Sequence, residues 1–208
     1  IAYKKRKKVL KQPGATLIDT DLNGYTYIAN PQILSDNKIN QKGQRIFYTY
    51  TAIPQSTGAD SIPYITIMQV NKVLTKEPVF VEDNDAKDYG TDPIEISGQS
   101  ISKAHLNLRY TFLNGGNHLI PHSISLLIAK DAQPDARGYL SAELRHDAAD
   151  DLQLNANSGY VSFTLENMPG FKEGTLKGFK IKTKTIKNET DIVEVTMNNN
   201  RKSMNFNI

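Results

Sequence analysis

The sequence predicts an all-β protein, a small barrel followed by a two-sheet sandwich, on three observations. Apolar residues recur with a period of two, in short runs that Gly, Asn, Asp and Pro separate. Val, Ile, Thr, Tyr and Phe, which favour strands, dominate those runs. Almost no segment shows the spacing of an amphipathic helix. A chain of 208 residues is long enough for two such domains.

The first domain is expected between residues 14 and 75. Its strands are predicted at residues 15–20, 25–29, 45–53 and 64–74. Asn23-Gly24 is the strongest hairpin signal, because both residues tolerate a positive φ. Pro31 ends this pairing, since proline has no N–H to donate, and a polar connector follows at 32–42. Four or five strands in roughly 60 residues are too few for a sandwich, whereas a closed barrel would leave no exposed edges.

Residues 76–93 form the most acidic stretch and are expected to be an exposed linker. The second domain is expected over residues 94–208. Its strands are predicted at residues 94–96, 105–112, 123–129, 138–146, 161–165, 179–184 and 193–197. Seven short strands with turn signals between them are typical of a sandwich whose sheets hide their apolar faces against each other. Lys180, Lys182 and Lys184 alternate with inward-facing neighbours, so a one-residue slip would bury all three.

The composition excludes several classes of site. The chain has no Cys, which removes thiol catalysis, disulfides, Cys-ligated zinc and iron–sulfur clusters. It has no Trp, the side chain best suited to stacking on sugars or single-stranded bases. No apolar run approaches the roughly 18 residues that a membrane-spanning helix needs.

Residues 1–13 are expected to be a basic leader or tether, because the run Lys4-Lys5-Arg6-Lys7-Lys8 is the densest cluster of charge. A solvated leader is the simplest interpretation of such a run. A nuclear address, a nucleic-acid-binding arm and a stem beside a membrane anchor are the alternatives.

The histidines do not predict a metal site or a cofactor. The chain has four: His105, His118, His122 and His146. His118 and His122 resemble a metal-binding pair, but their rings would share a face only in a helix, which Pro121 disfavours. The segment Asp147–Asp151 resembles a cation-binding loop but lacks the ligand spacing and the terminal Glu of a calcium hand. We therefore expect no metal and turn or strand-end positions for the histidines.

The segment Glu143-Leu144-Arg145-His146-Asp147 combines acidic, basic and imidazole groups in one strand. His146 is in line with the inward residues of that strand and is expected to be a core histidine that hydrogen-bonds a loop carbonyl. Asp147 points to the opposite face, which places a His–Asp dyad poorly. We assign no catalytic residue, and a hydrolase that uses Glu143, His146 or Asp147 at the rim of the sandwich is the alternative.

Lys180, Lys182 and Lys184 form a basic face. A functional interpretation is that this face and the barrel together bind a nucleic acid. However, the net charge is only +3, no aromatic residue lies between the lysines, and Glu194 is expected on the partner strand. Alternating lysines also protect an exposed strand against edge pairing. We therefore expect no nucleic-acid partner, and a nucleic-acid-binding barrel protein is a second alternative.

Tyr48 and Tyr50 are the candidate binding residues, because strand alternation places both on one face of an aromatic strand. In a chain without Trp, recognition of a glycan would have to rest on Tyr or Phe. The alternative is that both rings belong to the core of the barrel.

Four segments resemble those of NigD-like proteins, a family of envelope lipoproteins from Bacteroidetes. They are Gly90–Ile96, Leu106–Tyr110, Ile120–His122 and Glu143–Ala148, in which Leu144 stands where the family has an aromatic residue. The order and spacing of these segments also support the resemblance, which covers roughly Gly90 to Met197. It implies an OB-like barrel followed by an immunoglobulin-like sandwich in a lipidated, exported protein.

The resemblance also implies that the Cys of the lipid anchor would lie upstream of Ile1, with the run Lys4–Lys8 at the start of the tether. The family's name comes from a proposed role in bacteriocin immunity, and the family offers no catalytic residues to carry over. We therefore expect a non-enzymatic lipoprotein, periplasmic or on the cell surface, that binds a protein or glycan partner. Membrane contact is expected only through the anchor.

Overall fold

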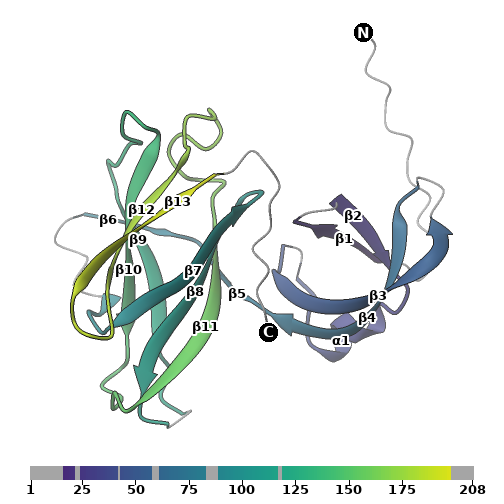
Figure 1. Ribbon diagram of the computed structural model, residues 1–208, viewed down its shortest axis with the longest axis horizontal. Helices are drawn as coiled ribbons and strands as arrows, with labels where there is room; N and C mark the ends of the chain where they lie inside the picture. Colours follow the sequence, from purple (N-terminus) through teal and green to yellow (C-terminus); the bar gives the residue numbers. More distant parts are fainter. Residues whose placement is uncertain are drawn as a thin grey trace. The chain divides into compact units, whose positions relative to one another are not determined.

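The computed structural model describes residues 16–21, 24–41, 43–57, 61–82, 89–116 and 119–197, with the backbone alone at 55–57. Within these residues the chain consists of thirteen strands and one short helix, which confirms the predicted all-β class (Figure 1). It divides into two compact units, Ile1–Val73 and Leu74–Ile208. The predicted leader at residues 1–13 and the side chain of His118 lie outside the described residues.

The N-terminal unit consists of a four-stranded sheet and one helix. Its elements are β1 (Thr16–Thr20), β2 (Gly24–Ile28), α1 (Gln32–Asp36), β3 (Ile46–Thr57) and β4 (Pro63–Lys72). The strand order is β1-β2-β4-β3, with β2 and β4 parallel and the other two pairs antiparallel. β1 and β2 pair in the antiparallel sense that the predicted hairpin requires, and Gly24 at the start of β2 has a positive φ of 74°.

The sheet of this unit is open, whereas the sequence predicted a closed OB-like barrel. Among the described residues β1 pairs only with β2 and β3 pairs only with β4, so these two strands are the edges. The connector predicted at 32–42 instead contains α1, whose Ile33 and Leu34 pack against a small core that includes Ile28 and Ile65. The helix therefore covers apolar surface that closure of the barrel would otherwise have buried.

The C-terminal unit is a β-sandwich, as predicted. Its strands are β5 (Leu74–Lys76), β6 (Val79–Val81), β7 (Ile94–Ser102), β8 (His105–Asn114), β9 (Ser123–Ala129), β10 (Tyr139–Asp147), β11 (Asn155–Thr164), β12 (Gly178–Lys184) and β13 (Thr190–Thr196). One sheet has the order β13-β12-β10-β9-β6 and the other β5-β11-β8-β7. Side chains from both sheets form one core, in which Leu106, Phe163 and Phe179 have no exposed surface.

The alternation of β12 decides which of its side chains enter this core. Phe179 and Ile181 are fully buried, while Lys182 is 53% exposed on the outer face. Lys180 lies opposite Glu194 of β13, as the sequence predicted. A slip by one residue would exchange phenylalanine for lysine and place an ammonium group among the apolar side chains of the core.

The structure differs from the expectation at the predicted linker, residues 76–93. Leu74–Lys76 and Val79–Val81 form β5 and β6, which pair in parallel with β11 and β9 of the sandwich. Three-residue strands are too short to show a period of two, and the acidic residues around them indicated exposure instead. Further along, Gly90 and Pro93 lie against the end of β10, where they form part of the polar end of the sandwich.

We expect Phe179→Ala to lower the free energy of unfolding by about 3–5 kcal/mol, because it leaves a cavity in the core. Lys182→Ala, on the exposed face of the same strand, is expected to change it by less than about 1 kcal/mol. Urea unfolding followed by far-ultraviolet circular dichroism measures both values. Equal losses for the two variants would contradict the observed register.

Candidate functional site

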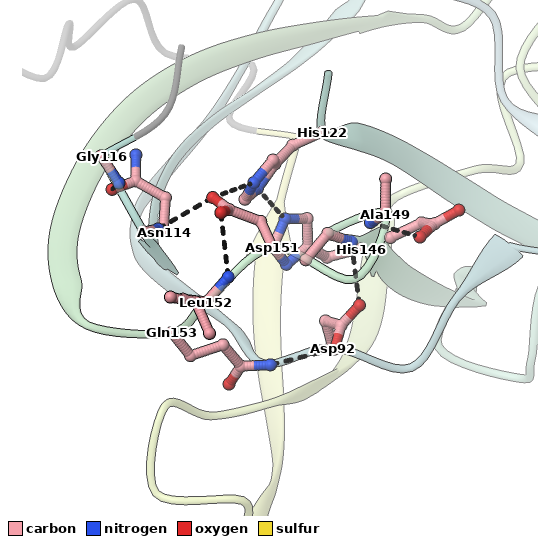
Figure 2. Close-up of polar contacts among 12 residues, drawn as sticks. Asp92, Asn114, Gly116, His122, His146, Ala149, Asp151, Leu152 and Gln153 are labelled. Carbon is pink, nitrogen blue, oxygen red and sulfur yellow. Dashed lines mark hydrogen bonds and ion pairs between the residues drawn. The ribbon is translucent and has the colours of Figure 1, made fainter. Parts of the chain in front are cut away.

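Two histidines and an aspartate form a chain of hydrogen bonds at one end of the sandwich (Figure 2). Nδ1 of His122 lies 2.9 Å from Nε2 of His146, and Nε2 of His122 lies 3.1 Å from Oδ2 of Asp151. At the other end of the chain, Nδ1 of His146 lies 3.0 Å from the carbonyl oxygen of Pro93. His122, His146 and Asp151 are termed the histidine network below.

Three parts of the sandwich bring these side chains together. His146 continues the inward set of β10 and is 1% exposed, which is the core position that the sequence predicted. His122 directly precedes β9, whose Ile124 pairs with His146 across the sheet. Asp151 follows β10 in a turn, where its carboxylate also accepts the backbone N–H of Gly115 at 2.8 Å. The network therefore joins the ends of two neighbouring strands to the loop that follows β8.

The hydrogen bonds determine how many protons the complete network holds. The Pro93 carbonyl can only accept, so Nδ1 of His146 donates to it. Three hydrogen bonds need three protons, whereas two neutral imidazoles and one carboxylate supply two. All three contacts can therefore be hydrogen bonds at the same time only when the network binds one further proton.

Burial favours the neutral form of His146. Desolvation lowers the pKa of His146, the carbonyl of Pro93 opposes this, and the charge of His122 lowers the pKa further. The backbone N–H of Gly115 and the hydrogen bond from His122 lower the pKa of Asp151. Burial of His146 therefore opposes a positive charge on that ring.

A second set of contacts holds the segment before β7 against the end of β10. The backbone N–H of Asp92 donates to the carbonyl of His146 at 3.0 Å. The carboxylate of Asp92 accepts from the backbone N–H of Ala148 at 2.8 Å and from the side-chain amide of Gln153 at 3.0 Å. Gly90 has a φ of 72°, and a Cβ there would lie 2.5 Å from the carbonyl oxygen of His146. Any larger residue would push this segment away from the strand.

The structure separates the residues of the hydrolase alternative. His146 faces the core, whereas Glu143 faces outward and contacts Arg145 at 3.1 Å and Lys182 at 3.5 Å. Asp147 accepts a hydrogen bond from a backbone N–H within its own turn. Glu143 lines a surface cavity whose lining does not include His146 or Asp147.

The contact between His122 and Asp151 is the part of the site that the sequence analysis missed. The two residues are 29 positions apart, and no local spacing connects them. The segment that resembled a cation-binding loop uses Asp151 to bind a histidine and backbone N–H groups instead. Among the described residues no group of three or more His, Cys, Asp or Glu side chains is arranged to hold a metal ion.

The candidate binding residues Tyr48 and Tyr50 lie on β3 of the N-terminal unit. Their partners on β4 are Val70 and Ile67, both in the small core, so the two rings face the core side of the sheet. The ring centroids are 5.8 Å apart. Tyr48 packs against the core, and burial raises its pKa, while Tyr50 is 52% exposed. Tyr48 thus fits the interpretation as a core residue, whereas Tyr50 is accessible to a ligand. A role of the two rings in binding stays a prediction.

Comparison with protein families identifies the sandwich. The family described as the NigD-like C-terminal beta sandwich domain matches residues 77–197, which is more than half of the chain. The matched region contains the whole histidine network and the four segments that carry the resemblance. A comparison with curated proteins finds no match.

Solved structures share the fold at low sequence identity. A protein of unknown function from Bacteroides vulgatus has a TM-score of 0.70 at 19% identity, with 90% of this chain and 87% of that chain covered. A candidate lipoprotein from Bacteroides fragilis has a TM-score of 0.58 at 11% identity, with 88% and 96% covered. A NigD-like immunity protein from Bacteroides caccae has a TM-score of 0.55 at 18% identity, with 73% and 70% covered.

The histidine network predicts a loss of stability below a pH of about 6.5, the ordinary pKa of histidine. Because the folded state holds the pKa of His146 below that value, the unfolded chain binds a proton that the folded state does not. The free energy of unfolding should then fall by up to about 1.4 kcal/mol per pH unit from this group, until the pH reaches the lowered pKa. Urea unfolding between pH 5 and 8 measures the slope.

His146→Gln removes the titrating group and should flatten this slope while lowering stability at every pH. His105→Gln, at the start of β8 and outside the network, is the matched control and should keep the slope. A slope that survives in His146→Gln would assign the pH dependence to other groups.

Proposed function

We propose that this chain, which belongs to the NigD-like family, is a non-enzymatic protein of the cell envelope that binds a protein or a glycan. The observation that carries the proposal is the aromatic pair of the N-terminal unit. Tyr50 exposes half of its surface beside Tyr48, whose ring is already fixed by packing. Rigid aromatic rings offer a large contact area at a small cost in conformational entropy.

The polar groups of the sandwich favour binding over catalysis. The histidine network is occupied by its own hydrogen bonds, so its imidazoles offer no free base to a substrate. Glu143 and Asp92 line one cavity, which is the arrangement that the hydrolase alternative would need. However, both oxygens of Asp92 accept hydrogen bonds, and Glu143 contacts two cationic side chains. We therefore place binding ahead of hydrolysis.

The lysines of β12 are an argument against a nucleic acid as the partner. Lys180, the first of the three, forms an ion pair with Asp135 at 2.6 Å. A lysine that is already paired contributes less to the counterion release that drives binding to phosphates.

The location in the envelope rests on the family and on the names of two structural neighbours. One neighbour is described as a candidate lipoprotein and the other as an immunity protein. We propose that this chain is exported and held by a lipid on a Cys upstream of Ile1, which would be its only contact with the membrane. The described residues contain no helix long and apolar enough to cross a bilayer. A role in bacteriocin immunity is the more specific form of the proposal.

We expect Tyr50→Ala to reduce binding to a bacterial glycan or peptidoglycan array by about tenfold, because truncating one central aromatic anchor typically costs more than 1 kcal/mol. Tyr48→Ala should have a similar effect on binding and an additional effect on stability, since it also opens the small core. Array binding and thermal unfolding of each variant separate the two contributions.

Tyr25→Ala is the control, because Tyr25 is 48% exposed and strand alternation puts it on the opposite face of the same sheet. A protein partner is tested in cells, with a photo-crosslinking amino acid at position 50 or at position 25. Crosslinks to an envelope protein should form from position 50 alone. Unchanged array binding together with equal crosslinking from both positions would end the proposal.

A further inference from the structure

A cavity of about 250 Å³ lies on the outer face of the larger sheet of the sandwich. Its floor is formed by β10 and β12, two parallel neighbours that place Glu143 beside Lys182. One wall is the segment at Thr91 and Asp92 that precedes β7. The turn between β12 and β13, with Asn188, also lines it. This cavity belongs to the C-terminal unit, whereas the aromatic pair on which the proposed function rests belongs to the N-terminal unit.

Basic side chains outnumber acidic ones in the lining of this cavity. Three cationic residues line it: Arg145, Lys182 and Lys184. Asp92 also lines it, but its two oxygens accept hydrogen bonds from residues 148 and 153 of the following turn. Glu143 is the carboxylate that contacts the basic groups, at 3.1 Å from Arg145 and 3.5 Å from Lys182. The lining thus contains three cationic and two carboxylate side chains, and Glu143 contacts two of the three cations.

Two of the three basic groups also donate to backbone carbonyls of the segment before β7. Nη1 of Arg145 donates to the carbonyl of Gly90 at 3.1 Å, and Nζ of Lys184 donates to the carbonyl of Thr91 at 3.1 Å. The wall itself lies directly against His146, where no Cβ would fit. Carbonyl oxygens orient these cations without cancelling their charge, which leaves the cavity preorganised for an anion.

The ion pair within the cavity is also incomplete. Nε of Arg145 is buried and has no hydrogen-bond partner, although it lies 3.1 Å from Oε1 of Glu143. The distance between Lys182 and Glu143 is longer than that of a charge-assisted hydrogen bond. An external oxyanion could therefore compete with Glu143 for Lys182 at small cost.

We propose that this cavity binds a compact oxyanion, such as a carboxylate, sulfate or phosphate group. Its volume is below the usual range of ligand pockets, roughly 300–1,000 Å³, which suits a single anionic group or one acidic sugar. Thr190 and Asn188 line the same space and supply hydroxyl and amide groups for the remaining hydrogen bonds. Ile192, opposite Lys182 on β13 and 61% exposed, provides an apolar neighbour for the body of the ligand.

The test is a titration of the full chain with sodium sulfate, inorganic phosphate and glucuronate, followed by amide NMR at constant ionic strength. Glucose is the neutral counterpart of glucuronate. We expect saturable shifts at residues 91, 145, 182 and 184 with the anions and none with glucose. The three anions distinguish carboxylate from sulfate and phosphate as the preferred group.

Four variants make the result specific to the cavity. Lys182→Gln and Lys184→Gln should each weaken binding about two- to fivefold, the effect expected of one partly exposed charge. Glu143→Gln removes the internal competitor and should tighten binding, a change that mere disruption of the site would not produce. Lys130→Gln is the control, since Lys130 is an exposed lysine paired with Glu82 on another part of the surface.

Shifts spread over all lysines, or an equal effect of Lys130→Gln, would show nonspecific ion binding and overturn the proposal. So would equal shifts with glucose, or weaker binding in Glu143→Gln when its thermal unfolding is unchanged. If Lys184→Gln unfolds, Lys182→Gln still decides, because Lys182 is largely exposed and its loss leaves the wall in place.

Discussion

A buried imidazole needs a hydrogen-bond partner for each nitrogen, and this requirement organises the polar end of the sandwich. An unsatisfied buried polar group costs about 1–3 kcal/mol. His146 meets the requirement with the Pro93 carbonyl on one side and His122 on the other. His122 in turn needs Asp151, whose carboxylate also fixes the backbone at Gly115. Hydrogen bonds that begin at one inward histidine at the end of a strand thus link three separate loops.

The two faces of β10 contribute to different features of the sandwich, because successive side chains point in opposite directions. The inward face ends in His146 and joins the histidine network, while the outward face carries Glu143 and Arg145 into the cavity. The segment at Gly90 connects the two, since its backbone lies against His146 and its carbonyl accepts from Arg145. The backbone that forms one wall of the cavity is therefore in contact with the end of the strand that carries the histidine network.

Local alternation explains what could be predicted from the sequence. A period of two is enough to place His146 inward, Lys182 outward, and Tyr48 and Tyr50 on one face, because each depends only on its own strand. The open sheet, the strands β5 and β6, and the contact between His122 and Asp151 depend on residues distant in the chain. The closed barrel was predicted from the need to protect edges, and the helix α1 supplies cover that the polar composition of its segment did not indicate.

The family resemblance and the proposed binding face lie in different parts of the chain. The segments that resemble the family include Gly90–Ile96, Ile120–His122 and Glu143–Ala148, and in three dimensions these three meet at the histidine network. Their shared chemistry is explained by the satisfaction of buried polar groups, which any sandwich of this construction needs whatever it binds. Tyr48 and Tyr50 precede the matched region, residues 77–197. Membership of the family therefore accounts for the architecture of the sandwich. Ligand specificity depends on exposed side chains that neither the core nor its buried hydrogen bonds require.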